Sequence, residues 1–212
     1  RKEDVARSID FLLAECYELS KPLNASQRQV LQRTQHNLQF RRHNGQLIVE
    51  LHWEVASHLF ASTVQAEDLW KNLTITELNG AAMKTLSSED LIFSLLIHGS
   101  RHLWERLLWI CDVGWIVSKH ELNWQILLER TRTTKTERMF LLGIYLSKKL
   151  LNVSLPSVIE KRIEQDRELE KLARVVITGI FSGPENKPVS VYKIFEFNLK
   201  VRKAWSSRVR YF

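Results

Sequence analysis

The stretch LIHGSRHLWERLLWICDVGWIV, residues 96–117, has the most informative hydrophobic pattern in the chain. On a helical period, polar and amphipathic side chains of this stretch share one face: His98, His102, Glu105, Trp109 and Asp112. Leucine, isoleucine and valine occupy much of the remaining circumference, which is typical of a buried helix. Because buried ionisable groups are costly unless they are paired or used, this polar row indicates a functional or tightly paired cluster.

Helical spacing of apolar residues recurs in several other stretches. It predicts helices over residues 3–16, 88–98, 124–130, 137–151 and 158–176. The helix from residue 88 either continues into residues 96–117 or breaks briefly at Gly99-Ser100. Ser87 followed by Asp90 is a capping-box-like helix start. Residues 27–36 are polar and fit either a short helix or a loop.

Two Asn-Gly pairs lie between runs of β-forming residues. Asn44-Gly45 predicts a hairpin with a tight two-residue turn, and Asn79-Gly80 a second turn. In the strand after the first turn, Ile48, Glu50 and His52 share one face. Glu50 and His52 either converge on a ligand or lie on the solvent side of the sheet.

Together these patterns predict an α+β fold. A small mixed α/β part with a β-hairpin covers residues 1–86, and a larger α-helical bundle covers residues 87–181. Residues 182–212 form a linker and a basic-aromatic C-terminal segment. That segment is expected to dock on its own domain as a helix or strand. The alternative is that it binds single-stranded nucleic acid.

Composition narrows the class of protein. The net charge of +7 favours an anionic partner, although a basic surface can also serve solubility. The two cysteines, Cys16 and Cys111, are interpreted as reduced core thiols of a cytoplasmic protein. No apolar run has the length of a membrane span. The sequence contains no glycine-rich phosphate loop, no G-x-S-x-G and no C-x-x-C, which argues against most familiar enzyme classes.

The pair His98-x-x-x-His102 allows three interpretations. The spacing suits two metal ligands on one helical turn, but the Glu that follows the first His in zinc proteases is missing. The two imidazoles can instead be satisfied core residues. In the third interpretation they contact a polyanionic ligand together with Arg101 and Arg106.

The motifs ELHW at residues 50–53 and HGSRHLWERLLWICD at residues 98–112 resemble those of uncharacterised bacterial nucleotidyltransferases with a polymerase-β-like core. The first helix, RKEDVARSIDFLLAECYEL, is similar to the helix that follows the catalytic strand in that family. NWQILLERTRTTKTERMFLLGIYLSKKLL, residues 123–151, extends the likeness, which covers roughly residues 1–170.

The resemblance implies transfer of a nucleoside monophosphate from an NTP to an acceptor with two Mg²⁺ or Mn²⁺ ions. Glu50 matches the family's third acid, and therefore is the expected catalytic and metal-binding residue. The paired carboxylates of the D-x-D strand are expected to precede residue 1, so the part over residues 1–86 is expected to be N-terminally incomplete. We expect the substrate to be bound by residues facing the Glu50 side of the hairpin: His52, His98, Arg101, His102 and Asp112.

Two other functions fit the same residues. One is a catalytically inactive module that binds a nucleotide or a partner protein through the same cleft. The other is a basic nucleic-acid-binding protein, whose affinity would fall steeply with salt. The sequence indicates neither the acceptor nor the oligomeric state.

Overall fold

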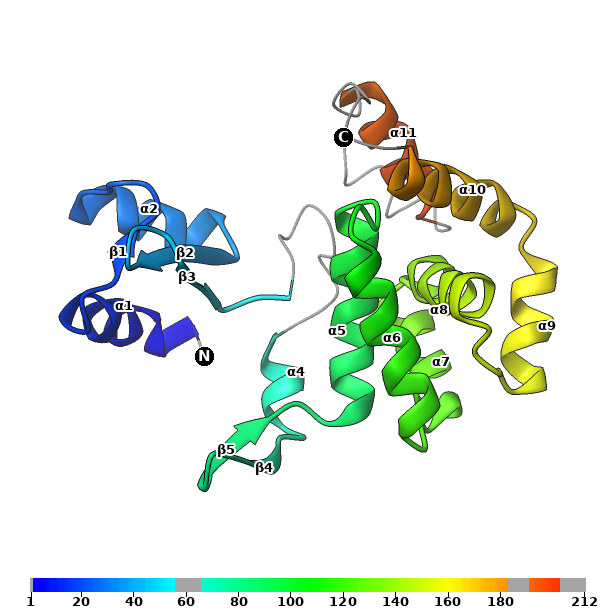
Figure 1. Ribbon diagram of the computed structural model, residues 1–212, viewed down its shortest axis with the longest axis horizontal. Coiled ribbons are helices and arrows are strands. Elements are labelled where there is room, and N and C mark those ends of the chain that lie inside the picture. Colours follow the sequence, from blue (N-terminus) through cyan, green and yellow to red (C-terminus); the bar gives the residue numbers. More distant parts are fainter. Residues whose placement is uncertain (1, 56–65, 183–190, 203–212) are drawn as a thin grey trace.

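The computed structural model describes residues 2–55, 66–182 and 191–202 (Figure 1). The N-terminal half contains a short 3-10 helix η1 (Lys2–Asp4) and these elements: α1 (Val5–Ala14), β1 (Glu18–Leu19), α2 (Ala25–Thr34), β2 (Asn37–Arg42), β3 (Leu47–His52), α4 (Ala66–Trp70), β4 (Thr74–Leu78) and β5 (Ala81–Thr85). Helices follow: α5 (Ser88–Arg101), α6 (Leu107–Lys119), α7 (Trp124–Thr133), α8 (Glu137–Leu151), α9 (Ser157–Gln165), α10 (Glu168–Phe181) and α11 (Val191–Lys200). This order confirms the α+β fold class, with small sheets first and packed helices after them.

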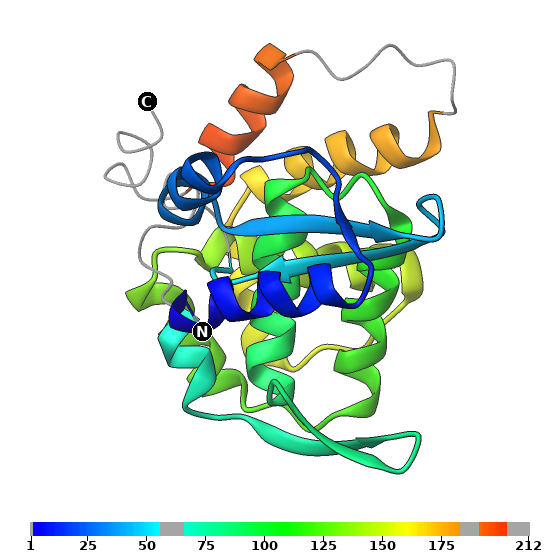
Figure 2. The same cartoon turned by 90° about the vertical axis from the view of Figure 1, so that its left-hand side faces the viewer.

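The N-terminal sheet has two faces of different character. Its strands are antiparallel in the order β1-β2-β3, and one face packs against α1 and α2. The core on that face includes Leu38, Phe40 and Trp53 together with Val5 and Ile9 of α1. Figures 1 and 2 show the two helices on this side of the sheet and α5 on the other. The face opposite α1 therefore turns toward the helical part.

The two hairpins differ in their turns. Asn79 and Gly80 alone connect β4 to β5, with φ of 52° and 80°, which confirms the second Asn-Gly turn. The first hairpin is confirmed, but its predicted two-residue turn is wrong. Arg42 pairs with Leu47, so residues 43–46 form the loop, and positive φ angles begin already at His43.

Helix α8 is the centre of the helical part. Side chains along most of its length are buried, and it packs against α5, α6, α7, α9 and α10. Its bounds are those predicted from the sequence. Phe197 and Val201, at the end of α11, belong to the same core. Residues 191–202 therefore dock on the helical part, as favoured from the sequence, while residues 203–212 lie outside the described residues.

The expectation of one helical face through residue 112 is wrong, because α5 ends at Arg101 and α6 begins at Leu107. The break does not lie at Gly99-Ser100 either. Leu103 has a left-handed φ of 53°, and the Trp104 N–H donates to the Gly99 carbonyl at 2.8 Å, a Schellman end for the helix. Trp104 is fully buried and lies against Gly99 and Gly143. Burial of this indole accompanies a reversal of the chain that periodicity did not show.

The helix predicted over residues 158–176 is also interrupted. Asp166 has an extended backbone between α9 and α10, and its carboxylate accepts hydrogen bonds from the backbone of Glu168 at 3.2 Å and from Arg138 at 2.7 Å. The buried ion pair with Arg138 fixes this turn. Ionic pairing with α8 thus explains an interruption within a stretch of continuous helical spacing.

Several local predictions are resolved by hydrogen bonds and exposure. Asn24 and Gln27 form a reciprocal capping box, which starts α2 in the ambiguous polar stretch. Ser87 caps α5 by accepting from the Asp90 N–H at 3.2 Å. Cys16 is exposed rather than in the core, because it follows the end of α1 in a left-handed turn. In the described part of the chain, no helix is long and apolar enough to cross a membrane.

Candidate functional site

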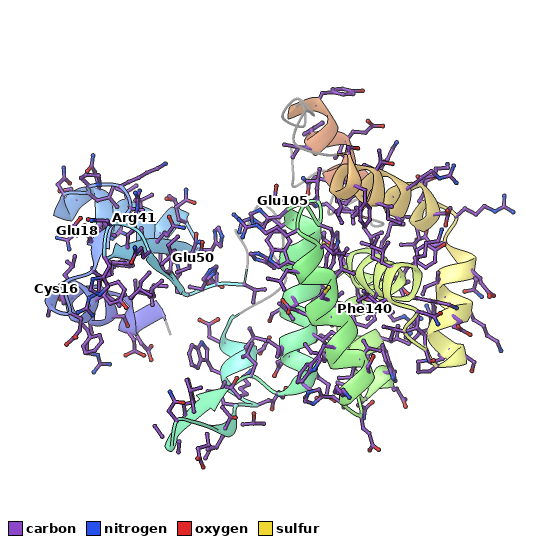
Figure 3. All side chains as sticks on the ribbon, viewed as in Figure 1. Cys16, Glu18, Arg41, Glu50, Glu105 and Phe140 are labelled. Carbon is purple, nitrogen blue, oxygen red and sulfur yellow. The ribbon has the colours of Figure 1, made fainter. Side chains whose placement is uncertain are left out.

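Glu50 lies on the sheet face opposite α1. On β2 and β3 the alternation of side chains places Gln39, Glu50 and His52 on this face, while Phe40 and Val49 point into the core. The Glu50 carboxylate accepts a hydrogen bond from the Gln39 amide at 3.3 Å, and its other oxygen lies 3.1 Å from His52 Nε2. Its side chain is 43% exposed and stands on the side of the sheet turned toward α5 (Figure 3). The carboxylate is thus oriented but open to a ligand.

The last turn of α5 supplies the opposite wall. Arg101 donates a hydrogen bond to His36 Nε2, which joins the helix to the residue just before β2. Because Nε2 accepts, the proton of the neutral His36 ring lies on Nδ1. That buried atom has no hydrogen-bond partner within the described ranges. The rings of His36 and His52 lie 5.9 Å apart, so His52 connects this pair to Glu50.

His98 and His102 complete the wall on α5. Their ring centroids are 4.7 Å apart, as expected for positions one helical turn apart. Trp109 of α6 packs on both rings, at 5.0 Å from His98 and 5.5 Å from His102. The Arg106 guanidinium lies 5.6 Å from the Trp109 ring. We call His36, His52, His98, Arg101 and His102 the imidazole cluster.

The cluster stabilises neutral imidazoles. Burial lowers the pKa of His36 to about 4, aided by the positive charge of Arg101. Burial and the neighbouring His102 lower the pKa of His98 to about 4. Burial also lowers the pKa of His102, again with Arg101 contributing. At pH 7, His36 and His98 are therefore uncharged, and Arg101 supplies a fixed positive charge beside them.

The neighbouring histidines also lower the pKa of Glu50, which favours its charged form. Partial burial would raise the pKa of this carboxyl, but the hydrogen bond and charge of His52, the Gln39 amide and the charge of His98 together lower it. Glu50 is therefore ionised at neutral pH. In return, its negative charge partly offsets the burial that lowers the pKa of Arg101. A carboxylate and a cation from different elements thus lie near each other, which suits a ligand that carries both phosphates and a metal ion.

A family model described as "uncharacterised nucleotidyltransferase" matches residues 1–152 of the chain. The chain belongs to this family. A comparison with curated proteins and a comparison with solved structures each gave no match. The matched residues include all of the imidazole cluster and Glu50, so the family assignment covers the site.

The structure brings together most of the predicted site residues of this nucleotidyltransferase-family chain. Glu50, His52, His98, Arg101 and His102 share one region through the contacts and charge interactions given above. Asp112 lies on α6, beyond the helix break, and within the described ranges no contact joins it to the cluster. Its predicted part in substrate binding stays a prediction.

His36 was not predicted. Nothing in its local sequence marks it, because its role comes from the tertiary contact with Arg101. Only the expected antiparallel pairing of β2 with β3 could have placed it near His52, through the neighbouring pair Asn37 and His52.

The metal ions expected for a nucleotidyltransferase fit Glu50 only in part. Its partly exposed carboxylate is an oxygen donor of the kind that Mg²⁺ prefers. Across the residues that the structure describes, however, no group of three or more His, Cys, Asp or Glu could hold a metal ion. The finding also applies to the zinc interpretation of His98 and His102, because no third ligand lies beside them in the described part of the chain. Glu50 would supply one ligand of a site that needs further carboxylates.

Proposed function

We propose that this protein transfers a nucleoside monophosphate from an NTP to an acceptor, with Mg²⁺ or Mn²⁺ as the metal. Glu50 would be a metal ligand, and the imidazole cluster would bind the triphosphate. When bound, the metal would stabilise the charge that develops on the phosphate oxygens. This proposal refines the family assignment to a substrate class and to named residues.

One observation carries the proposal: Glu50 of β3 lies near the Arg101 end of α5, since His52 and His36 connect the two residues. The two elements are far apart in the sequence, and their charges interact, since Glu50 offsets the lowering of the Arg101 pKa. Arginine binds phosphate oxygens with a planar, permanently charged group. The packing that sets Arg101 against His36 also fixes this group in place before a ligand arrives.

The neutral imidazoles suit the same role. His98 and His102 are uncharged or largely so at neutral pH, so each presents a ring N–H and a ring nitrogen acceptor. A bound phosphate would favour the protonated ring and raise the pKa of either residue. Trp109 restricts both rings by packing on them, which reduces the entropy lost when they engage a ligand.

Magnesium-dependent release of pyrophosphate from NTP by the protein tests the proposal. Glu50→Gln keeps the size of the side chain and removes the charge, so the rate is expected to fall about a hundredfold or more. Glu18→Gln on β1 is the matched control, because Glu18 is exposed at a distance from α5 (Figure 3) and its variant should retain the wild-type rate.

The result separates catalysis from binding. Loss of turnover in Glu50→Gln with retained NTP binding would support a metal-binding role for Glu50. Wild-type protein that binds NTP but releases no pyrophosphate, with any acceptor supplied from a cell extract, would instead identify a catalytically inactive nucleotide-binding module. Equal rates in wild type and Glu50→Gln would refute the assignment of Glu50.

A further inference from the structure

A cavity of about 270 Å³ adjoins the imidazole cluster. It lies between the end of β3, helix α4 and the middle of α5, and its walls are largely apolar and aromatic. Trp53 and Trp70 line it together with Leu91 and Leu95 of α5. The Trp53 indole itself belongs to the sheet core on the α1 side. Its volume is close to the lower end of the range for small-molecule sites, which is about 300 Å³. The cavity therefore has the size and lining for a flat, largely apolar group.

Glu54 also lines this cavity. Glu54 is only 7% exposed, and within the part of the chain that the structure describes its side chain has no hydrogen-bond or ion-pair partner. Its carboxylate oxygens are not among the fully buried side-chain atoms that lack a partner, so a ligand in the cavity can still reach them. The Glu54 side chain is not needed to hold the backbone in place at this point. The backbone N–H groups of Trp53 and Glu54 do this by donating hydrogen bonds to the His36 carbonyl. The carboxylate is therefore free to accept hydrogen bonds from a ligand in the cavity.

The cavity and the imidazole cluster are continuous. His52 and His98 belong to both: they line the cavity and they contact the other cluster residues. A single ligand can therefore place a charged group beside Arg101 and an apolar ring against the leucines of α5. An NTP has this combination, with phosphates at one end and a planar base at the other.

We propose that this cavity holds the nucleobase of the NTP and that Glu54 selects bases with N–H donors. This inference rests on the proposed function. Guanine fits best, because its adjacent N1–H and N2–H groups can donate to both carboxylate oxygens of Glu54. Uracil fits worst, since the carbonyl oxygens on either side of its only ring N–H would face the carboxylate. Contact with Trp70, which is partly exposed in the lining, would add affinity for any base and give no selectivity.

Calorimetric titration of GTP, UTP and inorganic tripolyphosphate into the full chain tests the inference. Wild-type protein should bind GTP at least about tenfold more tightly than UTP, as expected for hydrogen bonds to a charged group. Glu54→Gln should reduce the GTP to UTP affinity ratio to about threefold or less, while tripolyphosphate binds as before. Glu77→Gln is the matched control, because Glu77 is exposed on β4 and does not line the cavity.

The probes separate failure of this inference from failure of the proposed function. Equal affinities for GTP and UTP, unchanged by Glu54→Gln, would overturn the inference and leave phosphate binding intact. If the protein bound none of the three probes, with or without Mg²⁺, the proposed function would fail and the inference with it. The Glu54→Gln variant should unfold cooperatively on heating, with a midpoint no lower than that of wild type. A changed GTP to UTP affinity ratio then does not come from misfolding.

Discussion

Acidification should destabilise this fold through His36. The ring is 2% exposed, and its pKa falls from 6.5 in the unfolded chain to about 4 in the folded protein. The groups around it are Arg101, His52, His98 and His102, and all of them disfavour its protonation. Between these two pKa values the unfolded chain binds more protons than the folded one. Folding stability therefore falls as the pH falls through this window.

The size of the effect follows from the two pKa values. At pH 7, both states of His36 are largely neutral, so its contribution to the pH dependence is close to zero. At pH 5, the unfolded chain is protonated at this residue and the folded protein is not, which lowers the free energy of unfolding by about 2 kcal/mol relative to pH 7. His98 acts in the same direction, and a discount for its partial exposure leaves about 1 kcal/mol.

Urea unfolding followed by tryptophan fluorescence at pH 7 and pH 5 measures this loss. His36→Asn removes the titrating ring, so its loss of stability between the two pH values should be smaller than that of wild type by about 2 kcal/mol. His43→Asn is the matched control, since His43 is exposed in the β2–β3 loop, and asparagine tolerates its left-handed φ of 52°. An equal pH dependence in wild type and His36→Asn would refute the burial argument.

Other predictions concern packing and charge in the helical part. Gly143→Ala would place a Cβ 2.5 Å from the Trp104 ring, so urea unfolding should show a loss of about 2–3 kcal/mol. Gly179→Ala meets no atom within 4 Å and should gain about 0.5–1 kcal/mol; a similar loss in both variants would contradict the packing argument. Asp90→Asn breaks the ion pair with Arg130. Because the Asp90 side chain is 2% exposed, the variant should lose about 3–5 kcal/mol of unfolding free energy; a loss below about 1 kcal/mol would show that the pair is solvated.

The sequence predicted regular elements where local rules agree with tertiary packing. Helix α8 was predicted at its observed bounds from apolar spacing alone. In the structure an acidic first turn and the left-handed Asn152 mark the same ends. The break at Leu103 was missed because the left-handed position there holds leucine, where glycine would have been the signal. Its cause is the burial of Trp104 against glycines of two helices, and that contact is tertiary.

For the candidate site too, the local patterns could be predicted from the sequence and the tertiary contacts could not. Strand alternation placed Glu50 and His52 on one face, and helical spacing paired His98 with His102. That these two pairs face each other was a hypothesis; in the structure His52 and His98 line one cavity. His36 and Glu54 escaped prediction because both lie in irregular segments beside strands, where no periodicity indicates which side chains are buried.

Histidine NMR of the full chain gives the most direct test that the imidazole cluster is the nucleotide site. Titration with GTP and Mg²⁺ should shift the ring signals of His52, His98 and His102 with one common dissociation constant, and the pKa of His98 should rise from about 4. The signals of His43 and His120, exposed and away from the cluster, should not move. Shifts confined to His43 or His120, or saturation by GTP with the cluster signals unchanged, would contradict the assignment of the site.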